Sequence, residues 1–255
     1  MTQKLPVSVF IVTKNEEKNL PRLLASISPA SQVVIVDSGS TDRTLAIAQD
    51  FGAELSHQDW LGMTRQKEVA LAKCTQPWVF NLDADEEVSP ELWDEIAALI
   101  AEDKANGLRI PLTEVFIGVK NHPLSRRNYY LRFFRRSAGK FGAALVHAGV
   151  EVQGEVREAV ADMFHYGEVS LLVKVNKINL YSSQVADEKF AKGKTPSLLK
   201  LVLVMPLMFF KSYIVRRNFL NGRRGFIGSL INAFYAFLKE AKLYELHLNR
   251  RLNGE

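Results

Sequence analysis

Residues 78–85 read WVFNLDAD, an apolar run that ends in two aspartates. The run predicts a strand over Trp78–Asp83. Alternate side chains of an extended segment face the same way, so Asp83 and Asp85 are expected on one face, at the carboxyl end of the strand. Open α/β sheets bind their ligands at that edge. Two glutamates follow, and a solvated acidic turn is the alternative interpretation.

Strand and helix patterns alternate on both sides of this run. The segment Gln32–Asp37 is apolar on both faces, which suits a parallel strand covered by helices on both sides. Ser40 is a candidate N-cap for a helix that ends at Gly52, and Ser89 is a candidate cap for another. The predicted strands are Val7–Thr13, Gln32–Asp37, Ala53–Ser56 and Trp78–Asp83, and the predicted helices cover residues 20–27, 40–51, 63–73 and 90–102. This alternation predicts an α/β fold with an open, mostly parallel sheet flanked by helices.

The middle of the chain, residues 118–194, is less regular and is expected to form short strands and loops. It contains the stretch NYYLRFFRR, residues 128–136. Its arginines, Arg132, Arg135 and Arg136, suit an anionic ligand, because guanidinium groups match phosphate geometry. The default interpretation is an amphipathic strand whose aromatic side chains lie in the core.

The basic charge of the chain is concentrated at its end. Residues 195–255 hold 10 Lys or Arg and 3 Asp or Glu, a balance of +7, which leaves 23 basic and 25 acidic side chains, a balance of −2, in the rest. The apolar segment Leu198–Val215 is interrupted by Lys200, Pro206 and Lys211, whereas a clean transmembrane span needs about 20 mostly apolar residues.

This tail predicts a helix pair that lies at or partly in a membrane interface, with its arginines on anionic lipid. The alternative is a helical hairpin packed on the α/β domain. A nucleic-acid partner is not expected, because the basic residues stand beside long apolar runs, which suit a membrane better.

The sequence also argues against a disulfide-bonded protein, a signal peptide and two common nucleotide-binding motifs. The single cysteine, Cys74, excludes an intrachain disulfide and fits a reducing compartment. The first apolar run is short and is followed by Lys14 and acidic residues, which indicates a strand rather than a signal peptide. Neither a dinucleotide-binding G-x-G-x-x-G after the first strand nor a P-loop is present.

A second acidic position follows the second predicted strand. Asp37 ends that strand and precedes Ser-Gly-Ser-Thr-Asp, and an acid at a strand end can accept hydrogen bonds from a nucleoside. The paired carboxylates Asp83 and Asp85 offer the oxygen ligands that suit Mg²⁺ or Mn²⁺. A simple helix cap by Ser40 is the alternative function for the segment after Asp37.

Three motifs together resemble the nucleotide-sugar motifs of family 2 glycosyltransferases. They are VFIVTKNE at residues 9–16, VDSGSTD at 36–42 and DAD at 83–85. The resemblance is strong over about the first 110 residues, and the remainder looks like the subgroup that builds lipopolysaccharide core. It implies a GT-A-type fold with residues 1–117 as the nucleotide-sugar-binding half, 118–194 as the acceptor-binding half, and 195–255 as a basic, amphipathic, membrane-associating helical tail.

The resemblance implies a role for each matching residue. Asp37 is expected to hydrogen-bond the uracil, Asp83 to face the ribose and the metal, and Asp85 to ligate the metal on the diphosphate. Lys67 or Arg65 is expected near the nucleotide, although an exposed, neighbour-paired Lys67 fits the sequence equally well. The remaining nucleotide-binding positions are Thr13, Lys14 and Glu16.

The catalytic base is where the chain departs from the family pattern. Relatives commonly carry Val-His-Glu, whereas this chain has alanine after His147. Glu151 is a candidate replacement, with an exposed strand residue as the alternative interpretation, and His147 is a candidate for diphosphate contact or catalysis. Glu155 and Glu158 are further candidates. His165 is expected to be a packed, hydrogen-bonded histidine.

The resulting expectation is a metal-dependent, inverting hexosyltransferase. It would move a hexose, with glucose implied by the resemblance, from a UDP-sugar to an anionic lipopolysaccharide-core or other lipid-linked saccharide. The enzyme would lie peripherally at the cytoplasmic face of the inner membrane, with Mg²⁺ or Mn²⁺ bound. The alternatives are a catalytically impaired nucleotide-sugar-binding protein that lacks the usual base and, less favoured, a nucleic-acid binder.

Overall fold

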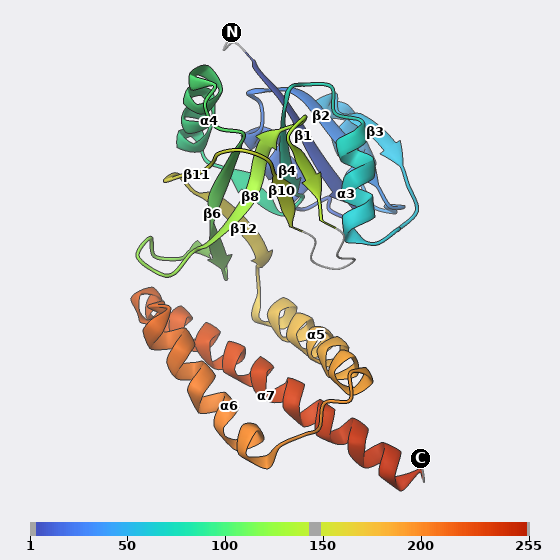
Figure 1. Cartoon of the computed structure of the whole chain (residues 1–255), viewed down its shortest axis with the longest axis vertical. Coiled ribbons are helices and arrows are strands. Elements are labelled where there is room, and N and C mark those ends of the chain that lie inside the picture. The colour runs from blue at the N-terminus through green and yellow to red at the C-terminus, as the bar shows by residue number, and fades with distance from the viewer. Residues whose placement is uncertain (1–3, 143–148, 254–255) are drawn as a thin grey trace. The chain divides into compact units, whose positions relative to one another are not determined.

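The computed structural model describes residues 4–142 and 149–253. The chain forms two compact units (Figure 1). The first unit contains residues 1–113 and 127–166 and is built around a sheet. The second contains residues 114–126 and 167–255 and is mainly helical. These limits differ from the three segments expected from sequence, because residues 114–126 and the segment from Gly167 onward belong with the C-terminal helices.

Four parallel strands form one half of the sheet, in the order β3-β2-β1-β4. The strands are β1 (Leu5–Thr13), β2 (Ala30–Asp37), β3 (Glu54–His57) and β4 (Trp78–Asp83), and the helices between them are α1 (Leu20–Ser26), α2 (Thr44–Phe51) and α3 (Met63–Ala72). In register, Thr13 lies opposite Asp37, and Val12 lies opposite Asp83. The carboxyl ends of three strands therefore meet at one edge, as the sequence predicts.

The other half of the sheet is largely antiparallel. After β4 come β5 (Glu86–Val88), α4 (Pro90–Glu102), β6 (Gly107–Phe116), β7 (Val119–Lys120), β8 (Asn128–Arg135), β9 (Gly139–Phe141), β10 (Val150–Val152), β11 (Val156–Glu158) and β12 (Met163–Glu168). Strand β8 runs antiparallel between β4 and β6, and β9 pairs with β10 in a separate two-stranded sheet. The expected α/β fold with helices flanking an open sheet is confirmed; parallel pairing joins β1–β4 and, in a short ladder, β11 to β6.

The two faces of the sheet are packed by different helices. Val9 and Ile11 of β1 belong to a buried cluster with α1, α2 and α4, whereas Phe10 belongs to a second cluster with α3. Trp78 of β4 stacks on Phe133 of β8, with ring centroids 5.0 Å apart. Each fully buried apolar side chain of this size contributes roughly 1.5–3 kcal/mol. The core therefore fixes β4 and β8, the strands that carry the site, against one another.

Two predicted helix caps have different outcomes. Ser89 accepts a hydrogen bond from the Leu92 backbone N–H, so its predicted N-cap on α4 is confirmed. The prediction for Ser40 is wrong, because α2 begins at Thr44 without a side-chain cap. The Ser40 hydroxyl donates to the Asp37 carboxylate instead. A charged acceptor three residues away competes successfully with the helix terminus.

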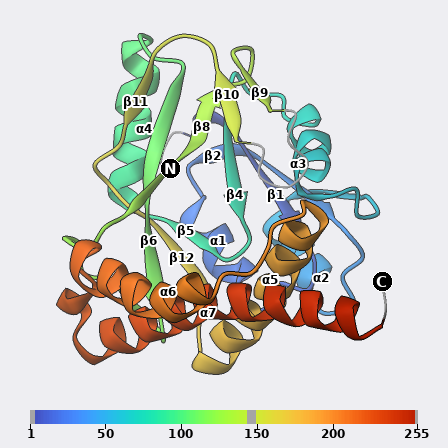
Figure 2. The ribbon, with the colours of Figure 1, turned by 60° about the horizontal axis from the view of Figure 1, so that its bottom comes forward.

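The second unit consists of helices around one long central helix. Helices α5 (Leu171–Ala191) and α6 (Leu198–Phe210) both lie along α7 (Gly222–Leu252) (Figures 1 and 2). A π-helical turn, Lys211–Val215, and a 3₁₀ turn, Asn218–Asn221, join α6 to α7. The expectation of strands and loops up to residue 194 is wrong for α5. The buried residues of this segment are spaced by four and so lie on one face of a helix: Lys174, Ile178, Ser182 and Ala186.

Candidate active site

The carboxyl ends of β1 and β2 are tied together by hydrogen bonds. The Asn15 backbone N–H donates to the Ser40 hydroxyl (2.8 Å), and the Glu16 backbone N–H donates to the Thr44 hydroxyl (2.7 Å). In return, the Thr41 backbone N–H donates to the Asn15 side-chain oxygen (2.8 Å). The two loops that carry the first two sequence motifs therefore form one continuous surface at the edge of the sheet.

Asp37 organises the turn that follows β2. Its carboxylate is only 2% exposed and accepts hydrogen bonds from the backbone N–H groups of Gly39 (2.8 Å) and Ser40 (2.7 Å), and from the Thr13 hydroxyl (3.0 Å). Burial favours the neutral form, but these bonds outweigh it and lower the pKa of Asp37. Gly39 has φ +92°, a conformation that favours glycine. The predicted contact of Asp37 with uracil stays a prediction.

The other predicted nucleotide-binding residues of this edge differ in exposure. Thr13 is buried against Asp37, Lys14 is exposed, and Glu16 is half-buried. Burial raises the pKa of Glu16, and the negative charge of Asp85 adds to the increase. A hydrogen bond from Asn19 opposes it but is weaker. Glu16 thus lies in the electrostatic field of the acidic motif at the end of β4, close to where a cation would be attracted.

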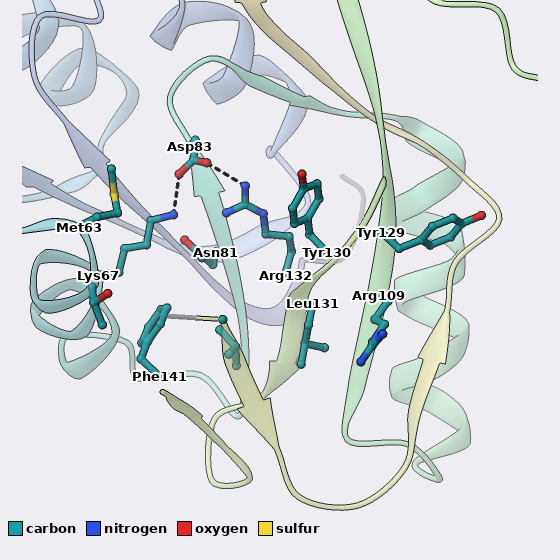
Figure 3. Close-up of a pocket in the computed structure, with 13 residues that line it drawn as sticks. Met63, Lys67, Asn81, Asp83, Arg109, Tyr129, Tyr130, Leu131, Arg132 and Phe141 are labelled. Atoms are coloured by element: carbon teal, nitrogen blue, oxygen red, sulfur yellow. Dashed lines mark hydrogen bonds and ion pairs between the residues drawn. The ribbon is translucent and has the colours of Figure 1, made fainter. Parts of the chain in front are cut away.

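Asp83 lies between two cations. Its Oδ1 is 2.7 Å from the Lys67 Nζ, and its Oδ2 is 2.8 Å from the Arg132 Nη2 (Figure 3). The same Arg132 nitrogen is 2.8 Å from the Glu86 Oε1, and the Asp83 backbone N–H donates to the Glu86 Oε2 at 2.8 Å. The Lys67 side chain is 11% exposed, so the alternative of an exposed lysine is wrong.

This charge cluster has strongly perturbed proton affinities. Burial favours a neutral Asp83, but the charges of Arg132 and Lys67 prevail and hold its pKa below the usual value. The neighbouring Glu86 side chain is 1% exposed. Burial and the Asp83 charge raise the pKa of Glu86 to about 7, against the attraction of Arg132. The site therefore holds one carboxylate that stays ionised and one that titrates near neutrality.

The raised pKa of Glu86 predicts a pH-dependent stability. Between its ordinary pKa of 4.5 and about 7, the folded protein binds a proton that the unfolded chain has released, so this stabilising contribution is lost as pH rises. The test is chemical denaturation of chelator-treated protein. As pH rises from 4.5 to 7, the free energy of unfolding should fall in the wild type relative to that of the Glu86→Gln variant, which has no carboxyl group to titrate at this position. A pH-independent difference between the two would contradict the perturbation.

Asp85 has a partner that sequence reasoning did not assign to the site. Its Oδ2 is 3.2 Å from the His165 Nε2, and its carbonyl accepts from the Tyr166 backbone N–H at 2.8 Å. Both side chains are about one-fifth exposed. The predicted hydrogen-bonded state of His165 is confirmed. The antiparallel pairing of β12 with β5, in which His165 lies opposite Glu86, brings the histidine here from 80 residues away in the sequence.

A cavity of about 470 Å³ opens beside Asp83. Lys67, Asn81, Tyr130 and Arg132 point into it around the aspartate (Figure 3). Within residues 4–142 and 149–253, Asp83 is the one carboxylate among the lining residues. The Asn81 Oδ1 atom is buried without a hydrogen-bond partner in the described part of the chain, although buried polar atoms are normally paired. It offers an acceptor to a ligand hydroxyl.

The predicted bases lie elsewhere or are not described. Glu151 in β10 is 65% exposed and 3.7 Å from Lys140, while its neighbours Gly149 and Val150 line the cavity. This placement favours the exposed-strand interpretation, and its role as a base stays a prediction. His147 lies outside the described residues. Of the further candidates, Glu155 pairs with Arg157, and Glu158 is exposed on β11.

The oxygen and nitrogen atoms at the carboxyl edge of the sheet suit a metal ion for which the protein supplies only some of the ligands. Among the described residues there is no cluster of three or more His, Cys, Asp or Glu side chains able to hold a metal alone. Asp85 and His165 nevertheless place an oxygen and a nitrogen 3.2 Å apart. Mg²⁺ is commonly bound by one or two carboxylates, with substrate phosphates completing the shell. The residues present therefore fit a divalent cation shared with a diphosphate.

Comparison with known proteins yields consistent similarities. The family described as "Glycosyl transferase family 2" matches residues 8–150. The chain is 35% identical over 258 residues to the lipopolysaccharide core biosynthesis glycosyltransferase LpsC of Rhizobium meliloti, covering 97% of this chain and 95% of that protein. It is 35% identical to an uncharacterized glycosyltransferase of Rickettsia typhi, over 96% and 89% of the two chains. The structure of S. aureus TarS 1-349 aligns at 17% identity with a TM-score of 0.47, covering 98% of this chain and 92% of that one.

Proposed function

Because this chain belongs to glycosyltransferase family 2, we propose that it transfers a hexose, with glucose the expected sugar, from a UDP-sugar to a lipid-linked saccharide with inversion. The name of the Rhizobium meliloti relative supports lipopolysaccharide core as the acceptor class. The observation that carries the proposal is the edge formed by β1, β2 and β4. Asp83 lies there between Lys67 and Arg132, and Asp85 lies beside His165.

The proposed donor site runs along this edge. The nucleoside would lie against the loops after β1 and β2, near Thr13, Lys14, Glu16 and Asp37. The diphosphate would lie toward Lys67 and Arg132, whose positive charges flank Asp83. The sugar would enter the cavity beside Asn81, whose unpaired side-chain oxygen can accept a hydrogen bond from a hydroxyl.

We propose that Mg²⁺ or Mn²⁺ is held chiefly by Asp85 with His165, and that Asp83 faces the ribose and the cation. Asp83 already accepts ion pairs on both oxygens, so its main effect would be to orient Lys67 and Arg132. When bound, the cation neutralises charge on the departing nucleoside diphosphate. A protein group must also accept the proton of the acceptor hydroxyl, and Glu151 and His147 remain the predicted candidates.

The helical unit is proposed to attach the enzyme peripherally to the cytoplasmic face of the inner membrane. Among the described residues, Leu198–Val215 is long and apolar enough to cross a bilayer, with a mean hydropathy of 1.9, and only 6% of it is buried in the protein. Exposed Leu199, Leu207 and Phe210 present an apolar surface on α6. Lys200, Lys211 and Pro206 interrupt the segment, which favours a helix lying in the interface over one that spans.

Isothermal calorimetry on the detergent-solubilised protein tests the donor site. UDP is expected to bind more tightly than ADP or GDP, and its affinity is expected to rise when Mn²⁺ is added. Absence of binding by all three nucleotides would overturn the transferase proposal. Selective UDP binding without turnover on any lipid-linked saccharide would favour the second candidate, a nucleotide-sugar-binding protein without a working base.

A further inference from the structure

The helical unit contains a basic cavity remote in sequence from the candidate active site. Its volume is about 440 Å³, and it lies where the end of α5, the start of α6 and the middle of α7 meet. Four lysines line it, Lys189, Lys192, Lys194 and Lys200, together with Glu188 and Glu240. The formal charge of these six lining groups is four positive and two negative, a balance of +2.

One buried carboxylate organises the cavity. Glu240 is 5% exposed and forms ion pairs with both Lys189 and Lys200, the latter at 3.3 Å. Lys192 pairs with Glu188 at the surface. Burial together with the charge of Lys189 lowers the pKa of the neighbouring Lys239, against the opposing charge of Glu240. Because four lysines and two glutamates line the cavity, Glu240 does not neutralise the cluster, and an anion entering the cavity would be stabilised.

A second, apolar groove lies between α6 and α7. Its volume is about 510 Å³, and its lining includes Leu201 and Met205 of α6 and Leu230 and Phe237 of α7. Phe237 lies three residues before Glu240 on α7, so these two lining residues are neighbours on one face of that helix. The linings of the groove and of the basic cavity therefore adjoin on α7, and we refer to the groove and the cavity together as the furrow.

We propose that this furrow binds one anionic phospholipid, with the phosphate headgroup in the lysine cavity and an acyl chain in the groove. Lysine ammonium groups bind phosphate as point charges. A nucleic acid or an acidic protein would use the lysines but not the adjoining groove. A solvated charged surface would not need two lysines to share a buried carboxylate. The inference rests on the proposed membrane attachment of this unit and adds headgroup selectivity to it, independently of the transferase reaction.

Vesicle co-sedimentation of the full-length protein tests the site. The variant Lys192→Gln/Lys194→Gln removes two cavity charges without touching the ion pairs of Glu240. The matched control, Lys177→Gln/Arg251→Gln, removes the same charge from α5 and α7 outside the cavity. On phosphatidylglycerol-containing vesicles, the cavity variant should bind about 25-fold more weakly than wild type, from about fivefold per lysine near an anionic surface. The control should lose about threefold or less.

Each remaining outcome bears on a different part of the inference. Binding to pure phosphatidylcholine vesicles should be equal for wild type and both variants, with unchanged melting temperatures. Equal losses for both variants on anionic vesicles would show unspecific attraction and overturn the site. A third outcome concerns the nature of the ligand. If soluble glycerol 3-phosphate binds to the wild type but not to the cavity variant, while both bind vesicles equally, the ligand is a free phosphate ester and the lipid proposal is overturned. Failure of the wild type to bind any vesicle would overturn membrane attachment itself, whereas UDP calorimetry reports on the transferase proposal separately.

Discussion

Replacing Asp85 by asparagine is expected to lower the turnover number by about 10²–10³-fold and to abolish the gain in UDP affinity on adding Mn²⁺. Loss of a cation that stabilises the leaving group removes several kcal/mol from the transition state, and each factor of ten corresponds to about 1.4 kcal/mol. The Asp85 side chain is 22% exposed, and asparagine keeps its size and a side-chain oxygen that can accept a hydrogen bond from His165. The melting temperature should therefore change little.

The comparison with two other aspartates makes this prediction specific. Asp59→Asn changes the same chemistry at a side chain that is 93% exposed, and it should leave turnover and Mn²⁺ dependence unaltered. Asp83→Asn should lower stability as well as activity, because Lys67 and Arg132 lose their shared counter-charge. Intact Mn²⁺ dependence in Asp85→Asn, with its loss in Asp83→Asn, would reverse the assignment of the principal metal ligand.

The predictable part of the site lies on the parallel strands. The predicted strands Val7–Thr13, Gln32–Asp37 and Trp78–Asp83 are confirmed, since short apolar runs that end in a polar or acidic residue leave little ambiguity. Because parallel strands present their carboxyl ends at one edge, the proximity of Thr13, Asp37 and Asp83 followed from the sequence alone.

The partners of the two acidic residues were not predictable in the same way. Arg132 faces Asp83 because β8 pairs antiparallel with β4, placing Phe133 opposite Phe80. The sequence offered Arg132 only as a ligand for an anion or as part of an amphipathic strand. His165 reaches Asp85 through the pairing of β12 with β5. Antiparallel pairings between strands separated by 50–80 residues leave no periodic signal in either strand, so only the tertiary structure reveals them.

The helical unit shows a different limit. The apolar segment Leu198–Val215 was readily found, whereas α5 was not. Its buried face contains Lys174, Ser182 and Ala186, which are too polar or too small to give a clear hydrophobic period. Small residues allow close approach to α7, and the lysine is neutralised by Glu168. Tertiary packing, rather than an apolar stripe, therefore defines this helix.

Arg132→Met is expected to lower the free energy of unfolding by about 3–5 kcal/mol, the usual loss when one partner of a buried ion pair is removed. The Arg132 side chain is 12% exposed and is the shared partner of Asp83 and Glu86. Met retains much of the apolar volume, so the loss is mainly electrostatic. Arg136→Met, an exposed arginine just beyond β8, is the matched control and should change stability by no more than about 0.5 kcal/mol.

The pH dependence and a second substitution separate lost charge pairing from lost packing. A protonated Glu86 needs no counter-charge, so the destabilisation by Arg132→Met should be larger at pH 8 than at pH 5. Adding Glu86→Gln removes the unpaired buried carboxylate, while Asp83 keeps its ion pair with Lys67. Chemical denaturation of the double variant should recover most of the lost stability at pH 8. A loss that is equal at both pH values and is not rescued would show that Arg132 stabilises the fold through packing alone.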